Sequence, residues 1–169
     1  MSYWRIFSLR VLFVPFFLTW LVLTSPRVVQ AKDPPSDACT LLPATQLSKV
    51  LQHSFSAPAK TTAPAAPYDR VTGTDCTYRG EKGSQLLFRI YVDPSAAVAK
   101  DTFIKLSAFY GPNRPVAGDW DSAYFDAKHL LHVQKGKERF AFVLSPLGAD
   151  PAPVEVQLKD LATWVAGQL

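Results

Sequence analysis

Three closely spaced aspartates are the residues of this sequence with the clearest potential for chemistry. Asp119 and Asp121 flank Trp120, and Asp126 follows shortly after them. Carboxylates beside an aromatic side chain could bind a sugar or a cation, or could serve as the acid and the base of a hydrolase. A calcium loop needs more ligands and a central glycine at fixed spacing, and this segment lacks both. Because Asp-x-Asp is also common in turns, we favour a structural role and keep a small hydrolase or inhibitor as the alternative.

The histidines are the next candidates, as metal ligands or as bases. His129 and His132 would share one face of a helix, but the segment around them is predicted as a strand, which turns them to opposite faces. We therefore predict no metal site. His53 could meet Asp69 or Asp75, or it could simply be solvated, and we favour solvation.

The signature motifs of common enzymes and cofactor-binding proteins are missing from the sequence. It contains no G-x-S-x-G, no phosphate-binding P-loop and no G-x-G-x-x-G. Lys135, Lys137 and Arg139 form a small basic group on a predicted hairpin, where lysines commonly protect a sheet edge. We accordingly predict a protein that is not an enzyme and has no cofactor.

The N-terminal segment, residues 1–31, has the three parts of a secretory signal peptide. Arg5 and Arg10 supply a positive start before an apolar stretch over 11–23, and the small residues Val29 and Ala31 mark a cleavage site before Lys32. The apolar stretch is shorter than the roughly 20 residues of a membrane-spanning helix. We predict a protein exported to the periplasm or the extracellular space, without stable membrane insertion after cleavage. An uncleaved anchor is the alternative.

The basic residues of the chain are unevenly distributed. Three of its 18 lysines and arginines fall within 1–31, which has no acidic residue, and the other 15 face 14 aspartates and glutamates. The exported part is thus close to neutral and has no electrostatic footprint for nucleic acid. Its length suits one domain with a real core.

Export also gives a meaning to the two cysteines, Cys39 and Cys76. In an oxidising compartment an isolated pair most simply forms one disulfide, which here would close a loop of 38 residues. The chain-entropy model assigns such a loop about 4 kcal/mol of stabilisation. A redox or nucleophilic role is the alternative, but the pair is not a C-x-x-C and has no nearby histidine.

The elements that position these residues follow from hydrophobic periodicity and turn residues. After a leader at 32–38, we predict one domain over 39–169, with a flexible Pro-, Ala- and Thr-rich loop at 54–67. Helices are predicted over 43–52, over 95–110 and at 154–165, and strands over 74–79, 85–92, 122–126, 129–134 and 138–144. The order α-β-β-α-β-β-β-α indicates an α+β fold with an antiparallel sheet and helices packed on one face.

Three short patterns within 39–144 carry a family resemblance. They are C-T-L-L-P from Cys39, C-T-Y from Cys76, and V-A-G-D-W-D-S-A-Y-F from Val116. The chain resembles small exported bacterial proteins of unknown function that show C-x-L-L-T, C-x-Y and V-x-G-x-G-D-x-A-Y-F, among them actinobacterial lipoproteins and the extracellular sensor domains of some serine/threonine kinases. The resemblance implies paired cysteines and no catalytic residue. Pro43 and Trp120 depart from the pattern, since a threonine and a small residue are usual there.

The strongest predicted strand suggests where a partner would bind. Its apolar residues Leu86, Phe88, Ile90 and Val92 are expected to pack on the helices, which turns Arg89 and Tyr91 to the other face. Aromatic and basic groups are typical of binding surfaces, and Trp120, with Asp119 and Asp121, is expected at the edge of this one. The alternative is that Trp120 closes the end of the core.

The sequence thus predicts a non-catalytic extracytoplasmic binding or sensor-like module for a protein, a glycan or a small ligand. The small hydrolase or inhibitor, built on the loop from Asp119 to Asp121, is one alternative. A cell-envelope assembly factor is the other.

Overall fold

The computed structural model describes residues 37–65, 68, 71–147 and 150–169. The predicted signal peptide and most of the predicted leader therefore lie outside the described residues. Among the described residues, no helix combines the length and the apolar character needed to cross a membrane.

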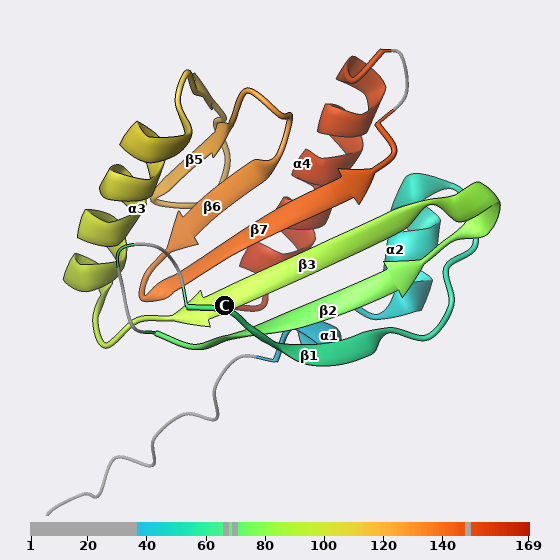
Figure 1. Cartoon of the computed structure of the whole chain (residues 1–169), viewed down its shortest axis with the longest axis horizontal. Coiled ribbons are helices and arrows are strands. Elements are labelled where there is room, and N and C mark those ends of the chain that lie inside the picture. Colours follow the sequence, from blue (N-terminus) through green and yellow to red (C-terminus); the bar gives the residue numbers. More distant parts are fainter. Residues whose placement is uncertain (1–36, 66–67, 69–70, 148–149) are drawn as a thin grey trace, which may run out of the picture. The chain divides into compact units, whose positions relative to one another are not determined.

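A seven-stranded antiparallel sheet organises the domain, in the spatial order β1-β2-β3-β7-β6-β5-β4 (Figure 1). The strands are β1 Ala59–Ala63, β2 Gly73–Arg79, β3 Gln85–Val92, β4 Arg114–Pro115, β5 Ser122–Phe125, β6 Leu131–Lys135 and β7 Glu138–Ser145. The helices are α1 Ala38–Leu41, α2 Ala44–Leu51, α3 Ala96–Tyr110 and α4 Ala152–Ala166, with a short 3₁₀ helix at Glu81–Gly83. The predicted α+β fold, with its antiparallel sheet, is confirmed.

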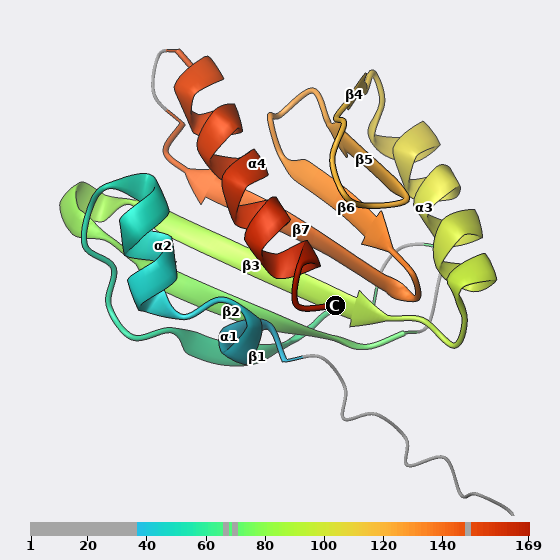
Figure 2. The same ribbon diagram turned by 180° about the vertical axis from the view of Figure 1, so that it is seen from behind.

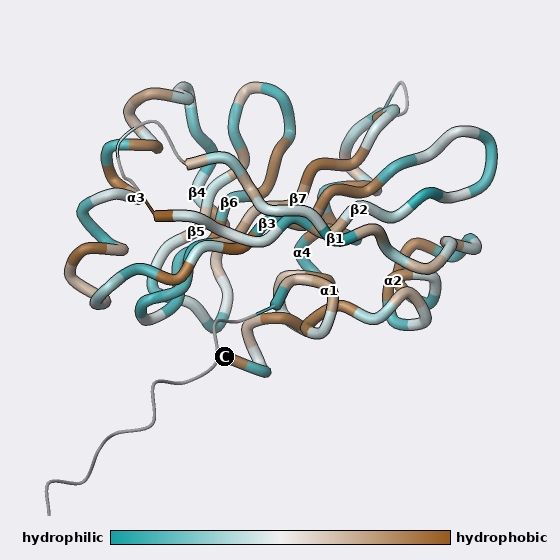
Figure 3. The backbone as a smooth tube through the Cα atoms, turned by 60° about the horizontal axis from the view of Figure 1, so that its bottom comes forward, coloured by the Kyte–Doolittle hydropathy of each residue, from teal (hydrophilic) through white to brown (hydrophobic). Residues whose placement is uncertain are grey.

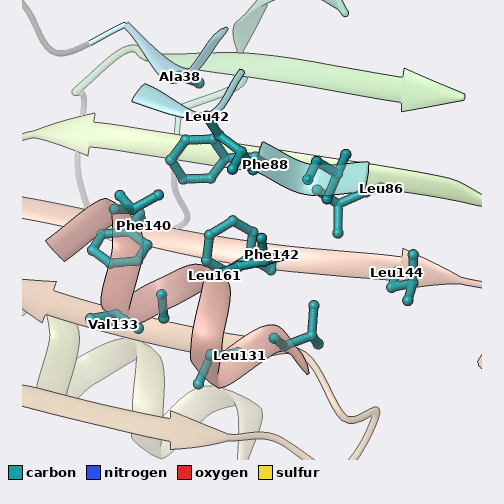
Figure 4. Close-up of a cluster of buried hydrophobic side chains, with 14 of the residues drawn as sticks. Ala38, Leu42, Leu86, Phe88, Leu131, Val133, Phe140, Phe142, Leu144 and Leu161 are labelled. Carbon is teal, nitrogen blue, oxygen red and sulfur yellow. The ribbon is translucent and has the colours of Figure 1, made fainter. Parts of the chain in front are cut away.

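The helices α1, α2 and α4 cover one face of the sheet. Figure 2 shows them lying across the strands, and the tilted view of Figure 3 places α1 and α2 on the same side. The large buried side chains of this face come from alternate positions of β3 and β7 and pack against α4 (Figure 4). They include Leu86, Phe88, Ile90, Phe140, Phe142 and Leu144 of the strands, and Leu158, Leu161 and Val165 of the helix.

Helix α3 differs from the expected arrangement, because it packs on the opposite face. Phe103 lies 5.1 Å from the Tyr124 ring and Tyr110 lies 5.3 Å from the His132 ring, between ring centroids. Ala123 and Phe125, on either side of Tyr124 in β5, belong to the core on the α4 side. Because side chains alternate along a strand, the Tyr124 side chain lies on the opposite face of the sheet. The strands carry large side chains on both faces, so the second face also needs an apolar cover, and α3 supplies it.

Strand β1 lies within the segment predicted as a flexible loop at 54–67. It pairs with β2 on one side only, and four of its five residues are exposed. The sequence Ala-Lys-Thr-Thr-Ala has no apolar alternation to reveal it, and Pro58 and Pro64 on either side are typical of loops and of edge strands alike. The two-residue β4 was missed because it is too short to show a period.

The predicted disulfide is present. Cys39 and Cys76 are bonded, with their Cα atoms 5.2 Å apart. The bond fastens the short α1 to the buried side of β2, and it encloses α2 and β1 within its loop.

Candidate ligand-binding groove

The aspartates of the 119–121 loop have separate partners. Asp119 is exposed and its carboxylate lies 3.0 Å from Lys135 Nζ. Asp121 Oδ2 instead accepts hydrogen bonds from Gln134 Nε2, at 3.0 Å, and from the Gly136 backbone N–H, at 2.7 Å. The two carboxylates thus bind different groups of the β6–β7 hairpin, and the cavity that Asp121 lines beside the start of α3 does not include Asp119. This geometry gives no support to a hydrolytic pair.

Trp120 lies apart from the Arg89 and Tyr91 surface. Its indole N–H donates to the Val116 carbonyl at 2.9 Å, and its half-buried ring packs against the core on the α4 side. A Cβ atom on Gly118 would stand 2.1 Å from this ring, so glycine is needed there. The five predicted binding residues therefore do not form one surface: Arg89 and Tyr91 line the α3 face of the sheet, and Trp120, with Asp119 and Asp121, belongs to a separate loop.

The histidines also lie in separate places. His129 precedes β6, and its Nδ1 lies 2.6 Å from Glu155, which also binds Arg114. His132 lies on the α3 face of β6, and His53 is exposed beside Phe55. Asp69 lies outside the described residues. Within the described ranges, no group of three or more histidine, cysteine, aspartate or glutamate side chains is arranged to hold a metal ion.

The predicted basic group on the last hairpin is not a surface patch, because Arg139 is buried. Strand alternation turns its side chain under α3, where Nε and Nη2 lie 2.5 and 3.1 Å from the Asp93 carboxylate. The pair joins the end of β3 to β7 beneath the start of α3. Lys135 points elsewhere, toward Asp119 and the Ala166 carbonyl.

The α3 face of the sheet contains an open groove of about 330 Å³. The strands β3, β6 and β7 form its floor, α3 forms one wall, and residues 64–65 form another. Most of its lining is apolar. The lining residues are Pro64, Ala65, Leu87, Arg89, Tyr91, Leu106, Tyr110, Leu130, His132, Ala141 and Val143.

A small residue at the centre of the floor accounts for the hollow. Arg89, Ala141 and His132 are direct neighbours across β3, β7 and β6. Because Ala141 ends at Cβ, the longer side chains on either side enclose space above it. The next row toward the β2–β3 hairpin pairs Leu87 with Val143 and is apolar.

Arg89, which lines the groove, forms an ion pair with an aspartate of the neighbouring strand. Its Nε and Nη2 each lie 2.7 Å from a different oxygen of Asp75 on β2. The hydrogen bond to Asp75 is the main cause of a raised Arg89 pKa, against a smaller opposing effect of burial, so the guanidinium stays charged. Asp75 is 6% exposed and does not line the groove.

His132 is fixed between two tyrosine rings. Its ring lies 5.3 Å from that of Tyr110 and 4.8 Å from that of Tyr124, both nearly parallel to it. His132 Nε2 lies 3.3 Å from an oxygen of Asp126. Burial acts to raise the Asp126 pKa, but hydrogen bonds from His132 and from the backbone N–H of Leu130 and Lys128 outweigh it and lower that pKa.

Tyr91 holds the opposite wall in place. Its hydroxyl donates to the Pro64 carbonyl at 2.8 Å, and the Arg139 guanidinium lies 5.1 Å from the centre of its ring. Farther along the same segment, Tyr68 meets Phe109 of α3 edge to face at 5.8 Å. Pro64 is therefore held to the sheet, and Tyr68 contacts α3.

The described lining of the groove combines apolar side chains with a few polar groups that neighbouring side chains hold in place. No serine, threonine or cysteine is among its described lining residues, and both cysteines of the chain are in the disulfide. A mostly apolar cavity with a few fixed polar groups is the usual character of small-molecule sites. Sequence reasoning placed Arg89 and Tyr91 on one face but missed Ala141 and Val143, and it considered His132 only as a metal ligand or base. Their alternation in the predicted strands was the available signal.

No family model, curated protein or solved structure matches this chain. The resemblance to exported bacterial proteins and kinase sensor domains therefore stays a prediction.

Proposed function

We propose that this protein is an exported, non-catalytic module that binds a small, largely apolar ligand in the groove on the α3 face of its sheet. The groove itself carries the proposal. Its volume of about 330 Å³ lies within the usual range for ligand pockets, roughly 300 to 1,000 Å³. Its apolar surface would be removed from water by a ligand, and that burial supplies the driving force.

Support for export comes from two independent features. Residues 1–31 have the pattern of a signal peptide, and the Cys39–Cys76 disulfide is typical of oxidising compartments. N-terminal sequencing of the mature protein is expected to begin at Lys32. A membrane-bound chain with an intact N-terminus would contradict this part of the proposal.

Ligand binding is tested with Nile red, a neutral fluorophore that brightens in apolar sites. We expect the mature protein to bind it saturably, and Ala141→Phe to reduce the affinity at least about tenfold, because the ring would fill the centre of the floor. Ala108→Phe is the matched control. It places the same ring on the exposed side of α3, outside the groove lining, and should leave the affinity unchanged.

Melting curves show that each variant is folded before its affinity is compared. Equal Nile red affinity in Ala141→Phe and in the wild-type protein would contradict the proposed site. Absence of saturable binding to the wild-type protein would contradict the proposal as a whole.

A further inference from the structure

The basic and acidic side chains around the groove are placed differently with respect to its surface. Arg89 and His132 both line it, and each is paired with an aspartate. Neither aspartate is among the lining residues, and both are buried, with Asp75 6% and Asp126 3% exposed. Among the described residues, the groove lining consequently has basic and phenolic side chains but no carboxylate.

The Arg89 guanidinium retains donors for a ligand. Asp75 takes its Nε and one N–H of Nη2, and Tyr91 also interacts with it. A guanidinium has more N–H groups than these contacts use. The Arg89 side chain is 29% exposed, against 9% for that of Asp75, and Arg89 lines the groove whereas Asp75 does not.

The apolar part of the groove continues from this basic row. Leu87 and Val143 are paired one row along the sheet, and Leu130 lies beside them at the entrance to β6. On the α3 wall, Leu106 adds a further apolar side chain. A ligand would thus meet cationic donors at one point of the floor and hydrocarbon along the rest.

We propose that the ligand of this groove is an anionic amphiphile, a monocarboxylate whose acid group binds at Arg89 and whose apolar chain or ring lies over Leu87 and Val143. This inference rests on the proposed function and narrows it to one chemical class. A carboxylate would form charge-assisted hydrogen bonds with Arg89, which are stronger than those of a neutral acceptor. A cationic head group would instead be repelled by the guanidinium and would find no acidic partner among the described lining residues.

The test compares decanoate, decanol and decylamine as competitors of Nile red, below the concentrations at which they form micelles. The three share one chain, so only the head group differs. We expect decanoate to displace the dye at a roughly tenfold lower concentration than decanol, and decylamine to be the weakest.

Two variants at the centre of the floor test the charge preference without changing Arg89 or Asp75. Ala141→Glu and Ala141→Gln have the same shape and differ in charge. We expect Ala141→Gln to retain the preference for decanoate and Ala141→Glu to lose or reverse it. Because neither variant removes a partner from a buried charge, both should fold, and melting curves check this.

A double variant then tests the role of Arg89 directly. Arg89→Gln with Asp75→Asn removes both charges together, and it is expected to abolish the preference for decanoate over decanol while Nile red still binds. Lys105→Gln with Asp101→Asn is the matched control, since it removes an exposed ion pair on α3. Equal displacement by decanoate and decanol, or stronger displacement by decylamine, would overturn the inference and leave the proposed groove intact. Failure of Ala141→Phe to affect Nile red would instead overturn the proposed function.

Discussion

The ion pair beneath α3 provides the sharpest stability test of the fold. Asp93 follows the end of β3, and Arg139 lies on β7. Their side chains are 0% and 3% exposed, and Nε lies 2.5 Å from Oδ2. A charge this deeply buried is tolerated only with its partner in place.

Replacing one partner should therefore be costly. Arg139→Met keeps an unbranched apolar side chain in place of the aliphatic part of arginine, but it leaves the Asp93 carboxylate buried without the Arg139 guanidinium. Breaking a buried pair in this way typically costs about 3 to 5 kcal/mol of unfolding free energy. For a domain of this size that corresponds to a fall in melting temperature of roughly 10 to 20 °C.

Replacing both partners should cost much less. Arg139→Met with Asp93→Leu removes both charges and fills the space with apolar atoms, which is often neutral or stabilising for buried pairs. Urea unfolding of the mature protein, its two single variants and the double variant gives the coupling energy of the pair. The reasoning is refuted if each single variant loses less than about 1 kcal/mol, or if the losses simply add in the double variant.

Three further predictions follow from other contacts. Removing the disulfide by Cys39→Ala with Cys76→Ala should lower the unfolding free energy by about 4 kcal/mol in urea titrations, because the unfolded chain then gains the freedom of an open loop. A loss below about 1 kcal/mol would contradict this entropic argument. Trp120→Ala should cost about 2 to 4 kcal/mol in the same assay and leave Nile red affinity unchanged, since the ring packs on the α4 side; weakened dye binding with normal stability would contradict that placement. The pKa of Glu155 is lowered, chiefly through its hydrogen bond with Arg114. The ionised carboxylate therefore adds to the free energy of unfolding at neutral pH, and this stabilisation is lost as the pH falls through the lowered pKa. The stability deficit of Glu155→Gln should thus shrink between about pH 7 and about pH 3, and a constant deficit would contradict the assignment.

Elements with strong periodicity were predictable from the sequence. The strand at 85–92 matches the observed bounds of β3, and the helix at 95–110 begins one residue from the observed start of α3, where Ser95 caps it. Local pattern alone determines such elements, because alternation or a three-and-four spacing extends over several turns or strand residues. β1 has no such pattern, and it is a strand only because β2 lies beside it.

The side of the sheet that α3 covers could not be read from the sequence. An apolar stripe on a helix shows that one side of the helix is buried, but it does not say against which face of a sheet. For the same reason Arg139 was expected at the surface, since its burial depends on α3 lying above it and on Asp93 being close.

Part of the groove floor could be predicted from the sequence. The turn at Lys135–Lys137 sets the β6–β7 register, which pairs His132 with Ala141. The pairing of Ala141 with Arg89 joins residues far apart in the chain, and no local signal specifies it. The centre of the floor could therefore be recognised only in the folded structure.

The most direct test of the central claim is a map of amide chemical shifts on adding decanoate to the ¹⁵N-labelled mature protein. The groove predicts saturable shifts concentrated on the rows that carry Arg89, Ala141 and His132, with the amides of α2 unchanged. Shifts concentrated on α2 or on the Trp120 loop, or no saturable shifts at all, would contradict a ligand site on the α3 face.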